Sequence, residues 1–335
     1  MKRLSGAAVV LGLLGLVTAF LLWWIPANDF LFVPDEAKPL AGKVEVEGGK
    51  PGAQEDGVYY VDLFVRRIRT LEQLLPFTRP EGSTFVEEEV LSPNDETDEE
   101  RRRQNREDMQ RSEEVASAVA LRALGYEVTA TPRGALVTSV APDVPAAGVL
   151  ESNDVIVAVD GVPVRTPDHL RAEIGKVEPG AELELAIRRG DEMLDVTVRT
   201  VASPQDASRA VVGILVDQDA EIELPLDVDI DLGRVGGPSA GLPFALEIAR
   251  QLGRDVTHGC RIAATGALAL DGTVVPIGGV KQKTIGARRA DVDFFLVPAG
   301  ENAQEAQRYA DGLRVIPVES FQQALRTLAT DAVKC

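Results

Sequence analysis

The sequence predicts a mixed α/β (α+β) protein with a small domain of its own inserted in the middle and an apolar helix at the N-terminus. Strands and helices alternate from Val211 to Leu328, which indicates a layered α/β body. The stretch Glu127–Val201 interrupts that body with short strands and one helix of its own. The run Leu4–Ile25 contains no charged residue and precedes everything else.

The N-terminal run predicts a retained membrane anchor over residues 1–27. At about 1.5 Å per residue it is long enough to cross a bilayer, and two tryptophans stand at its far end. Lys2 and Arg3 precede it, so we expect a single-pass protein with a cytoplasmic N-terminus and an extracytoplasmic body. A cleaved signal peptide is the alternative, but the run ends at Trp24-Ile25-Pro26 without small residues at cleavage spacing.

The charge, the motifs and the cysteine content of the chain disfavour several classes of function. The 335 residues carry a net charge of −18, which disfavours nucleic acid as a partner because its phosphates would be repelled. No phosphate-binding loop of the Gly-x-x-x-x-Gly-Lys-Ser/Thr type occurs, so we expect no use of ATP and no cofactor. Cys260 and Cys335 are the only cysteines; their pairing is left open, and we assign them no metal.

A glycine-rich turn presents the candidate nucleophile, Ser239. The segment reads Gly236-Gly237-Pro238-Ser239-Ala240-Gly241, and the following residues up to Leu252 have the apolar period of a helix with one buried face. Ser239 would then stand at a helix N-terminus, where free amides meet the positive end of the helix dipole. We expect amides near Ser239 and Ala240 to hold the oxyanion of an acyl-transfer intermediate.

A serine needs a base, and Lys281 is the candidate. It follows the strand Thr273–Ile277 and a Gly-Gly turn, at the start of a helix. Burial would lower the pKa of its amine toward neutrality. The alternative is an α/β-hydrolase elbow with His258 as base; His258 follows Ser239 by only nineteen positions, which leaves little room for the intervening acid, and His169 precedes the serine.

The order and spacing of these motifs resemble the proteolytic domain of Lon-type proteases. The motifs are Gly237-Pro238-Ser239-Ala240-Gly241, Thr265-Gly266 and Pro276-Ile277-Gly278-Gly279-Val280-Lys281-Gln282-Lys283. The resemblance implies a catalytic dyad of Ser239 and Lys281, supported by Thr265, with Gly237 and Ala240 shaping the turn. Two positions depart from the Lon pattern: Gly236 replaces an acid, and Ala267 replaces a glutamate. The resemblance also implies a hexameric ring.

The region before the insertion is expected to belong to the same protease fold. Lys43–Glu47 and Val58–Val65 have the pattern of a β-hairpin. A charged segment, Glu87–Glu114, leads into a helix from about Asp98 to Leu124. Because the Lon proteolytic domain also has a hairpin and a helix before its serine, we expect residues 40–125 and 205–335 to form one discontinuous domain.

The inserted stretch, residues 126–202, resembles a bacterial PDZ domain in the order of its strands, turns and helix. PDZ domains bind peptide ends by adding a strand to a sheet edge. By position, a peptide carboxylate would meet the backbone of Arg133, Gly134, Ala135 and Leu136. The groove would lie between strand Leu136–Val140 and helix Thr166–Ile174. A small domain that merely braces the N-terminal helix is the alternative.

Together these features resemble the membrane-anchored, PDZ-containing, Lon-like serine proteases of the bacterial YlbL type. The function expected from the resemblance is ATP-independent cleavage of proteins or peptides outside the cytoplasm, with the PDZ domain presenting substrate C-termini. The alternative from another class is a catalytically silent PDZ adaptor.

Overall fold

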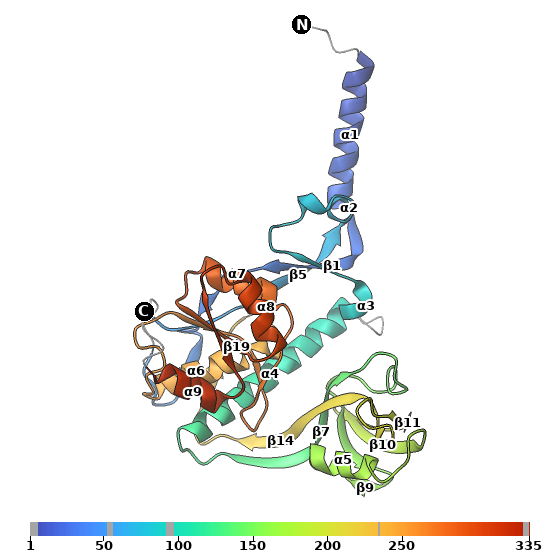
Figure 1. Ribbon diagram of the computed structural model, residues 1–335, viewed down its shortest axis with the longest axis vertical. Coiled ribbons are helices and arrows are strands. Elements are labelled where there is room, and N and C mark those ends of the chain that lie inside the picture. The colour runs from blue at the N-terminus through green and yellow to red at the C-terminus, as the bar shows by residue number, and fades with distance from the viewer. Residues whose placement is uncertain (1–5, 52–55, 92–96, 234, 331–334) are drawn as a thin grey trace.

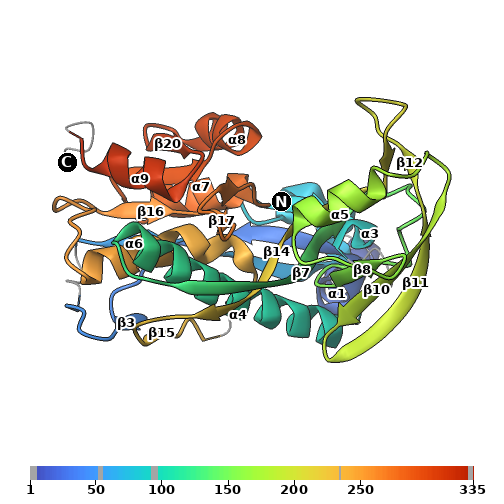
Figure 2. The ribbon, with the colours of Figure 1, turned by 90° about the horizontal axis from the view of Figure 1, so that it is seen from below.

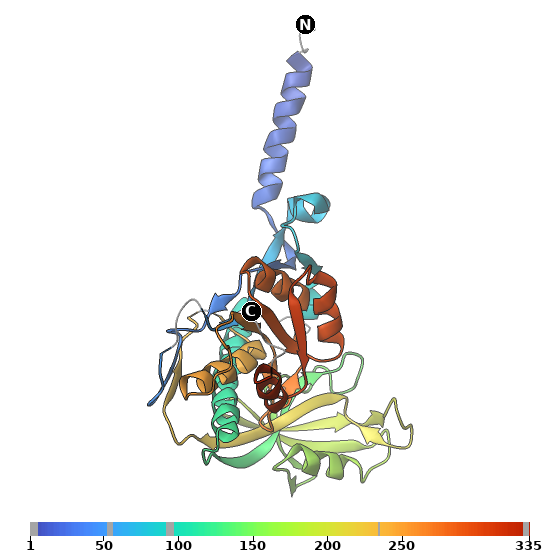
Figure 3. The same ribbon diagram turned by 60° about the vertical axis from the view of Figure 1, so that its left-hand side comes forward.

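The computed structural model describes residues 6–51, 56–91, 97–233, 235–330 and 335. One helix, α1 (Gly6–Trp24), projects from a body that holds all other elements, as Figures 1 and 3 show. The body has two parts, each with its own apolar core, and a long helix, α4 (Asp98–Ala123), touches both.

The predicted membrane anchor is not supported. Within the described ranges, none of the helices combines the length and the apolar character that a membrane span requires. Helix α1 has 19 residues, which at about 1.5 Å per residue is roughly 28 Å, against a hydrocarbon core of about 30 Å. It ends where β1 (Pro26–Pro34) begins, because proline has no amide to continue the helical ladder. Lys2 and Arg3 lie outside the described residues.

A five-stranded sheet forms the centre of the larger part. Its order is β2-β4-β16-β19-β20, and β16 runs parallel to both of its neighbours. The strands are β2 (Lys38–Pro39), β4 (Val58–Tyr60), β16 (Ile262–Ala264), β19 (Phe294–Pro298) and β20 (Arg314–Val318). Segments from the two ends of the sequence therefore share one sheet, as the expected discontinuous domain requires.

Helices cover both faces of this sheet. Successive side chains of a strand point to opposite faces, so Tyr60, Ile262 and Phe294 enter one core and Tyr59 and Phe295 enter another. The first core is closed by helix α4 together with two later helices, α6 (Gly241–Gln251) and α9 (Phe321–Leu328). The second is closed by helices α7 (Val280–Arg289) and α8 (Glu301–Tyr309). Figure 2 shows the helices on either side of β16.

The predicted N-terminal hairpin is wrong. Strand β3 (Val44–Val46) pairs with β15 (Val228–Ile230), which leads toward the serine turn, whereas β4 is buried inside the central sheet. Both segments have strand patterns, but each finds a partner far away in the sequence. A smaller sheet, β5-β1-β6, links α1 to the body; its remaining strands are β5 (Leu63–Arg69) and β6 (Thr84–Val86). Around it lie three short helices, α2 (Thr70–Leu74), η1 (Pro76–Thr78) and α3 (Glu88–Leu91).

Helix α4 begins and ends within one residue of its predicted bounds. Its N-terminus is held by a capping box, in which the Thr97 hydroxyl accepts from the Glu100 amide and the Glu100 carboxylate accepts from the Thr97 amide. Its apolar side, which includes Val115 and Val119, packs into the core of the larger part. Helix α4 lies between the two parts (Figure 1) and also contacts the smaller part through Arg111 and Asp108.

The smaller part has its own sheet, in the order β11-β10-β8-β7-β14. Its members are β7 (Thr129–Val140), β8 (Val155–Val159), β9 (Val162–Pro163, beside β8), β10 (Glu182–Arg189), β11 (Glu192–Arg199) and β14 (Ile214–Glu223). Helix α5 (Pro167–Ile174) closes its core with Leu170 and Ile174. Val212 and Val216 also pack in this core, so β14 belongs here rather than to the larger part where we expected it. A short pair, β12 (Val201–Ala202) with β13 (Ala210–Val211), precedes it.

The two cysteines form a disulfide. Cys260 precedes β16, and Cys335 closes a loop of sequence separation 75. With Asp293 they are the one group of possible metal ligands among the described residues, but their sulfurs are bonded to each other.

Candidate active site

Ser239 stands in a tight turn that opens directly into a buried helix. The turn is a single 3-10 element, η2 (Pro238–Ala240), followed at once by α6. Gly237 enters it at φ +91°, a conformation that favours glycine because it has no Cβ. The first amides of α6 are already bonded, since the Gly241 amide donates to the Pro238 oxygen and the Leu242 amide donates to the Gly266 oxygen. The candidate donors for an oxyanion are therefore the amides of Ser239 and Ala240, in the turn before the helix.

The amine that meets Ser239 belongs to Lys283. Its Nζ lies 2.6 Å from the Ser239 Oγ, and its side chain is only 4% exposed. Glycine in the left-handed conformation at position 279 allows α7 to start sharply, and the first turns of that helix carry Lys283 toward the serine. The structure thus brings a hydroxyl and a buried amine into direct hydrogen-bonding contact.

Thr265 ties the two halves of this pair together. It follows β16, and its fully buried hydroxyl lies 3.3 Å from the Lys283 Nζ. The same hydroxyl donates to the main-chain oxygen of Ser239 at 3.3 Å, and the Gly266 amide donates to that oxygen at 2.9 Å. Thr265 therefore fixes the lysine and the serine turn at once, but the lysine that it supports is Lys283 and not Lys281.

The electrostatic setting favours an uncharged amine. Burial lowers the pKa of Lys283 from 10.5 to about 8, and the negative charge of Asp62 opposes part of that shift. At pH 7 about a tenth of the molecules would carry the neutral amine. A neutral amine is able to accept the proton of a serine hydroxyl, which a charged one is not.

Lys281, the predicted base, is not beside Ser239. Its Nζ donates to the main-chain oxygen of Ser83 at 3.2 Å and to the Thr84 hydroxyl at 3.3 Å, and it lies 5.5 Å from the centroid of the Tyr309 ring. Residues two apart on a helix point about 200° away from each other. Because Lys283 faces the serine, Lys281 faces the opposite side of the helix. The predicted pair of Ser239 and Lys281 is therefore wrong, and the lysine that contacts the serine is Lys283.

A signal in the sequence could have identified Lys283. Helix positions three and four apart share a face. On α7 the structure buries Val280 and every residue from Gln282 to Ala287, whereas Lys281 is only partly buried. Lys283 has an apolar residue three positions before it, Val280, and another four positions after it, Ala287, and this spacing is the signal that favours it over Lys281.

His258 is placed away from the serine. Its amide and its Nδ1 contact Asp255, in the loop that follows the far end of α6. Ser239 precedes the near end of that helix, whose 11 residues span roughly 16 Å. The hydrolase alternative, with His258 as base, therefore has no support in the geometry.

One of the two departures from the Lon pattern, Gly236, has a steric explanation. A Cβ at Gly236 would lie 2.9 Å from the Cβ of Asn105 on α4, so an acidic side chain does not fit there. The Gly237 amide donates to the main-chain oxygen of Asn105. Ala267, the other departure, opens strand β17 (Ala267–Leu268), which pairs with β18 (Val274–Val275).

The predicted peptide-binding edge of the smaller part is also corrected. Arg133, Gly134, Ala135 and Leu136 lie on β7, and β7 has β8 on one side and β14 on the other. A strand inside a sheet has no edge to offer a peptide. The two edge strands are β11 and β14, and the Gln218 side chain of β14 donates to the main-chain oxygen of Arg165, just before α5.

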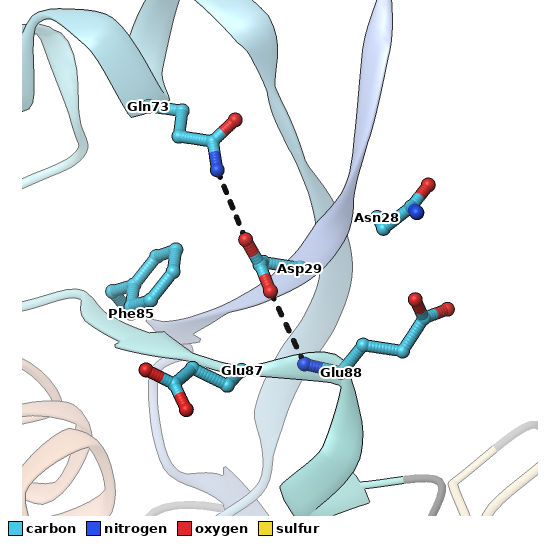
Figure 4. Close-up of a pocket in the computed structure, with 6 residues that line it drawn as sticks. All are labelled: Asn28, Asp29, Gln73, Phe85, Glu87 and Glu88. Atoms are coloured by element: carbon cyan, nitrogen blue, oxygen red, sulfur yellow. Dashed lines mark hydrogen bonds between the residues drawn. The ribbon is translucent and has the colours of Figure 1, made fainter.

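A separate pocket of about 520 Å³ lies near the base of α1 (Figure 4). Its centre is Asp29, whose carboxylate accepts from the Gln73 side chain at 3.0 Å and from the Glu88 amide at 3.2 Å. The lining consists of Asn28, Asp29, Gln73, Phe85, Glu87 and Glu88. These residues include no serine, threonine, cysteine or lysine, so this pocket does not offer a second hydroxyl–amine pair.

Two family models match the chain. The model of the PDZ domain matches residues 122–200, and the model of the Lon protease C-terminal proteolytic domain matches residues 195–331, which includes the serine, the threonine and both lysines. The chain joins a PDZ domain to a Lon-type proteolytic domain.

Relatives of this Lon-type chain include three bacterial proteins. "Lon protease" of Chloroflexus aggregans is 30% identical over 53% of this chain and 22% of its own length. "Lon protease 1" of Sorangium cellulosum is 36% identical over 38% of this chain and 16% of its length. "Lon protease 2" of Bacillus subtilis is 34% identical over 32% of this chain and 18% of its length. The chain thus spans about a fifth of the relatives that it matches.

Proposed function

We propose that this protein is a serine endopeptidase that works with a Ser239–Lys283 dyad and without ATP. The observation that carries the proposal is the 2.6 Å contact between the Ser239 Oγ and the Lys283 Nζ, made where the amine is shielded from water. The matched Lon proteolytic domain supports the same activity. Since the sequence carries no phosphate-binding loop, substrates would have to arrive unfolded or be held by the PDZ domain.

The mechanism follows from the contacts. Neutral Lys283 accepts the Ser239 proton as the Oγ attacks a peptide carbonyl. The developing oxyanion is stabilised by the amides of Ser239 and Ala240, in the turn just before α6. The lysine then gives its proton to the leaving amine. Water, deprotonated by the same lysine, hydrolyses the acyl-enzyme. Thr265 keeps the amine directed at the hydroxyl throughout.

The PDZ domain would bind the C-terminal ends of substrates along β14. This strand is an edge of its sheet, and Ile214 and Val216 are partly buried against the core that α5 closes. Gly213, at φ +82°, starts the strand with a turn that suits close approach of a carboxylate to the backbone. The groove between β14 and α5 therefore replaces the one predicted on β7.

We place the activity outside the cytoplasm. The Cys260–Cys335 disulfide supports this location, because such bonds persist in oxidising compartments and are rare in the cytosol. A ring of several copies remains a proposal from the Lon resemblance.

The test is proteolysis of an unfolded protein such as reduced casein by the purified chain, with and without ATP. We expect cleavage that ATP does not change and that Ser239→Ala abolishes. Cleavage that persists in Ser239→Ala would overturn the dyad. Complete inactivity of the wild-type chain toward casein and toward a peptide library would instead favour the adaptor function.

A further inference from the structure

Helix α4 touches the PDZ edge strand with one side and the nucleophile turn with another. Its neighbouring residues Arg111 and Ser112 make these two contacts, about 100° apart around the helix. On the proteolytic side, the buried Ser112 hydroxyl donates to the main-chain oxygen of Pro238 at 3.1 Å. About two turns earlier, the Asn105 main-chain oxygen accepts from the Gly237 amide at 2.9 Å. These residues hold the turn that positions Ser239.

On the PDZ side, Arg111 holds strand β14 by its backbone and by a carboxylate. The guanidinium donates to the main-chain oxygen of Gln218 at 2.6 Å and pairs with Asp219 at 3.2 Å. Asp219 is 8% exposed and also pairs with Arg188 of the PDZ strand β10. Asp108, one turn earlier on α4, accepts from Asn153 of the PDZ domain at 2.9 Å. The contact between α4 and the PDZ domain is therefore built from buried or half-buried charged groups, and changing its geometry is energetically costly.

We propose that binding of a free peptide C-terminus to the groove between β14 and α5 raises the turnover of the proteolytic site, and that α4 transmits this effect. The inference rests on the proposed function. A peptide that adds a strand to β14 orders the strand whose Gln218 carbonyl Arg111 holds. Ordering at one site lowers the entropic cost of ordering a second site that is linked to it. The same helix then holds Pro238 through Ser112, so the nucleophile turn spends more time in the geometry that brings Ser239 to Lys283.

The experiment separates the peptide that activates from the peptide that is cut. Turnover is measured with an internally quenched peptide whose C-terminus is amidated, so that it cannot present a carboxylate to the PDZ groove. The activator is a six-residue peptide ending in Val-Val with a free carboxylate, and its amidated form is the control. We expect the free form to raise kcat about fivefold or more, and the amidated form to leave it unchanged.

Variants on the two sides of α4 test the path. The activation ratio is kcat with the free peptide divided by kcat without it, and we expect it to fall to about one in Arg111→Met and in Ser112→Ala. The Ser112 hydroxyl contacts the proteolytic side, so Ser112→Ala should retain its affinity for the peptide. Arg111→Lys should restore part of the ratio. Arg106→Met is the matched control, because Arg106 is exposed on the same helix, and it should keep the full ratio.

The outcomes distinguish this inference from the proposed function. Basal cleavage without any effect of the free peptide, an inhibitory effect, or full activation in Ser112→Ala would overturn the coupling and leave the peptidase intact. Failure of the free peptide to bind at millimolar concentration would overturn the assignment of the groove, and the coupling with it. Basal cleavage that is equal in Ser239→Ala and the wild type would overturn the proposed peptidase itself.

Discussion

The two faces of helix α7 carry the same residue type in opposite environments. Lys281 lies near Tyr309 on the partly exposed face and bonds to the hydroxyl of Thr84, whereas Lys283 is buried against Ser239. The Lys283 amine is shielded from water, and this burial lowers its pKa. The comparison teaches that burial, and not the presence of a lysine in a motif, makes a base of this side chain.

The largest expected effect comes from replacing one of the two lysines, Lys283, and leaving the other in place. Lys283→Met should lower kcat/KM by about a thousandfold or more, because the serine loses the only amine in contact with its hydroxyl among the described residues. Lys281→Met should stay within about threefold of the wild type, because its amine bonds to Ser83 and Thr84 instead. The measurement is steady-state cleavage of a fluorogenic peptide. Equal losses in both variants would contradict the distinction between the faces.

The pH dependence is the next largest effect. Below pH 8, kcat/KM should fall about tenfold for each unit of pH, because the fraction of neutral Lys283 falls in that proportion. Above pH 8 the activity should level off. The Lys281→Gln variant should give the same profile. A profile that is flat between pH 6 and 8 would show that the base is not a titrating amine of this pKa.

The support of the lysine by Thr265 should have a smaller effect. Thr265→Val keeps the shape of the side chain but removes the hydroxyl that contacts the Lys283 amine and the Ser239 carbonyl. We expect kcat to fall roughly tenfold with little change in KM, since orientation of the base is lost and substrate contacts are not. The matched control is Thr284→Val, where an equally buried hydroxyl bonds only to the helix backbone at Val280. An equal fall in both would mean that the loss is structural.

The last expected effect concerns stability and not catalysis. Lys283 has a depressed pKa in the folded chain, so between pH 8 and about 10.5 the unfolded chain binds a proton that the folded chain does not. The free energy of unfolding of the wild type should therefore rise with pH in that window, relative to Lys283→Met, by up to about 3 kcal/mol. Urea unfolding at several pH values measures this difference. A difference that stays constant across the window would contradict the shifted pKa.

Much of the site could be predicted from the sequence, but the partner of the serine could not be chosen by spacing alone. The turn at Ser239 and the threonine at position 265 follow from local motifs, and the structure places both in the site. The error at Lys281 arose because the motif contains two lysines and only the helical phase separates them. The bounds of helix α4 were predicted within one residue, because caps and apolar period are local signals.

Pairing of strands was the part that could not be predicted. The residues of β3 and β4 have the pattern of a hairpin, yet their partners, β15 and β16, lie roughly 180 to 200 residues away. The PDZ edge was misplaced for the same reason, since β14 follows the inserted domain and returns to pair with β7. Alternation of side chains identifies a strand but carries no information about its neighbour.

The central sheet has a consequence for how the chain matures. Strand β4 lies between β2 and β16, so the central sheet of the larger part cannot form until nearly the whole polypeptide has been synthesised. The PDZ domain, whose core uses residues from 135 to 216, has all its strands long before that. A partly synthesised molecule would thus possess the strands of its PDZ domain without the Ser239–Lys283 pair, so the proposed cleavage would be confined to chains whose synthesis is complete.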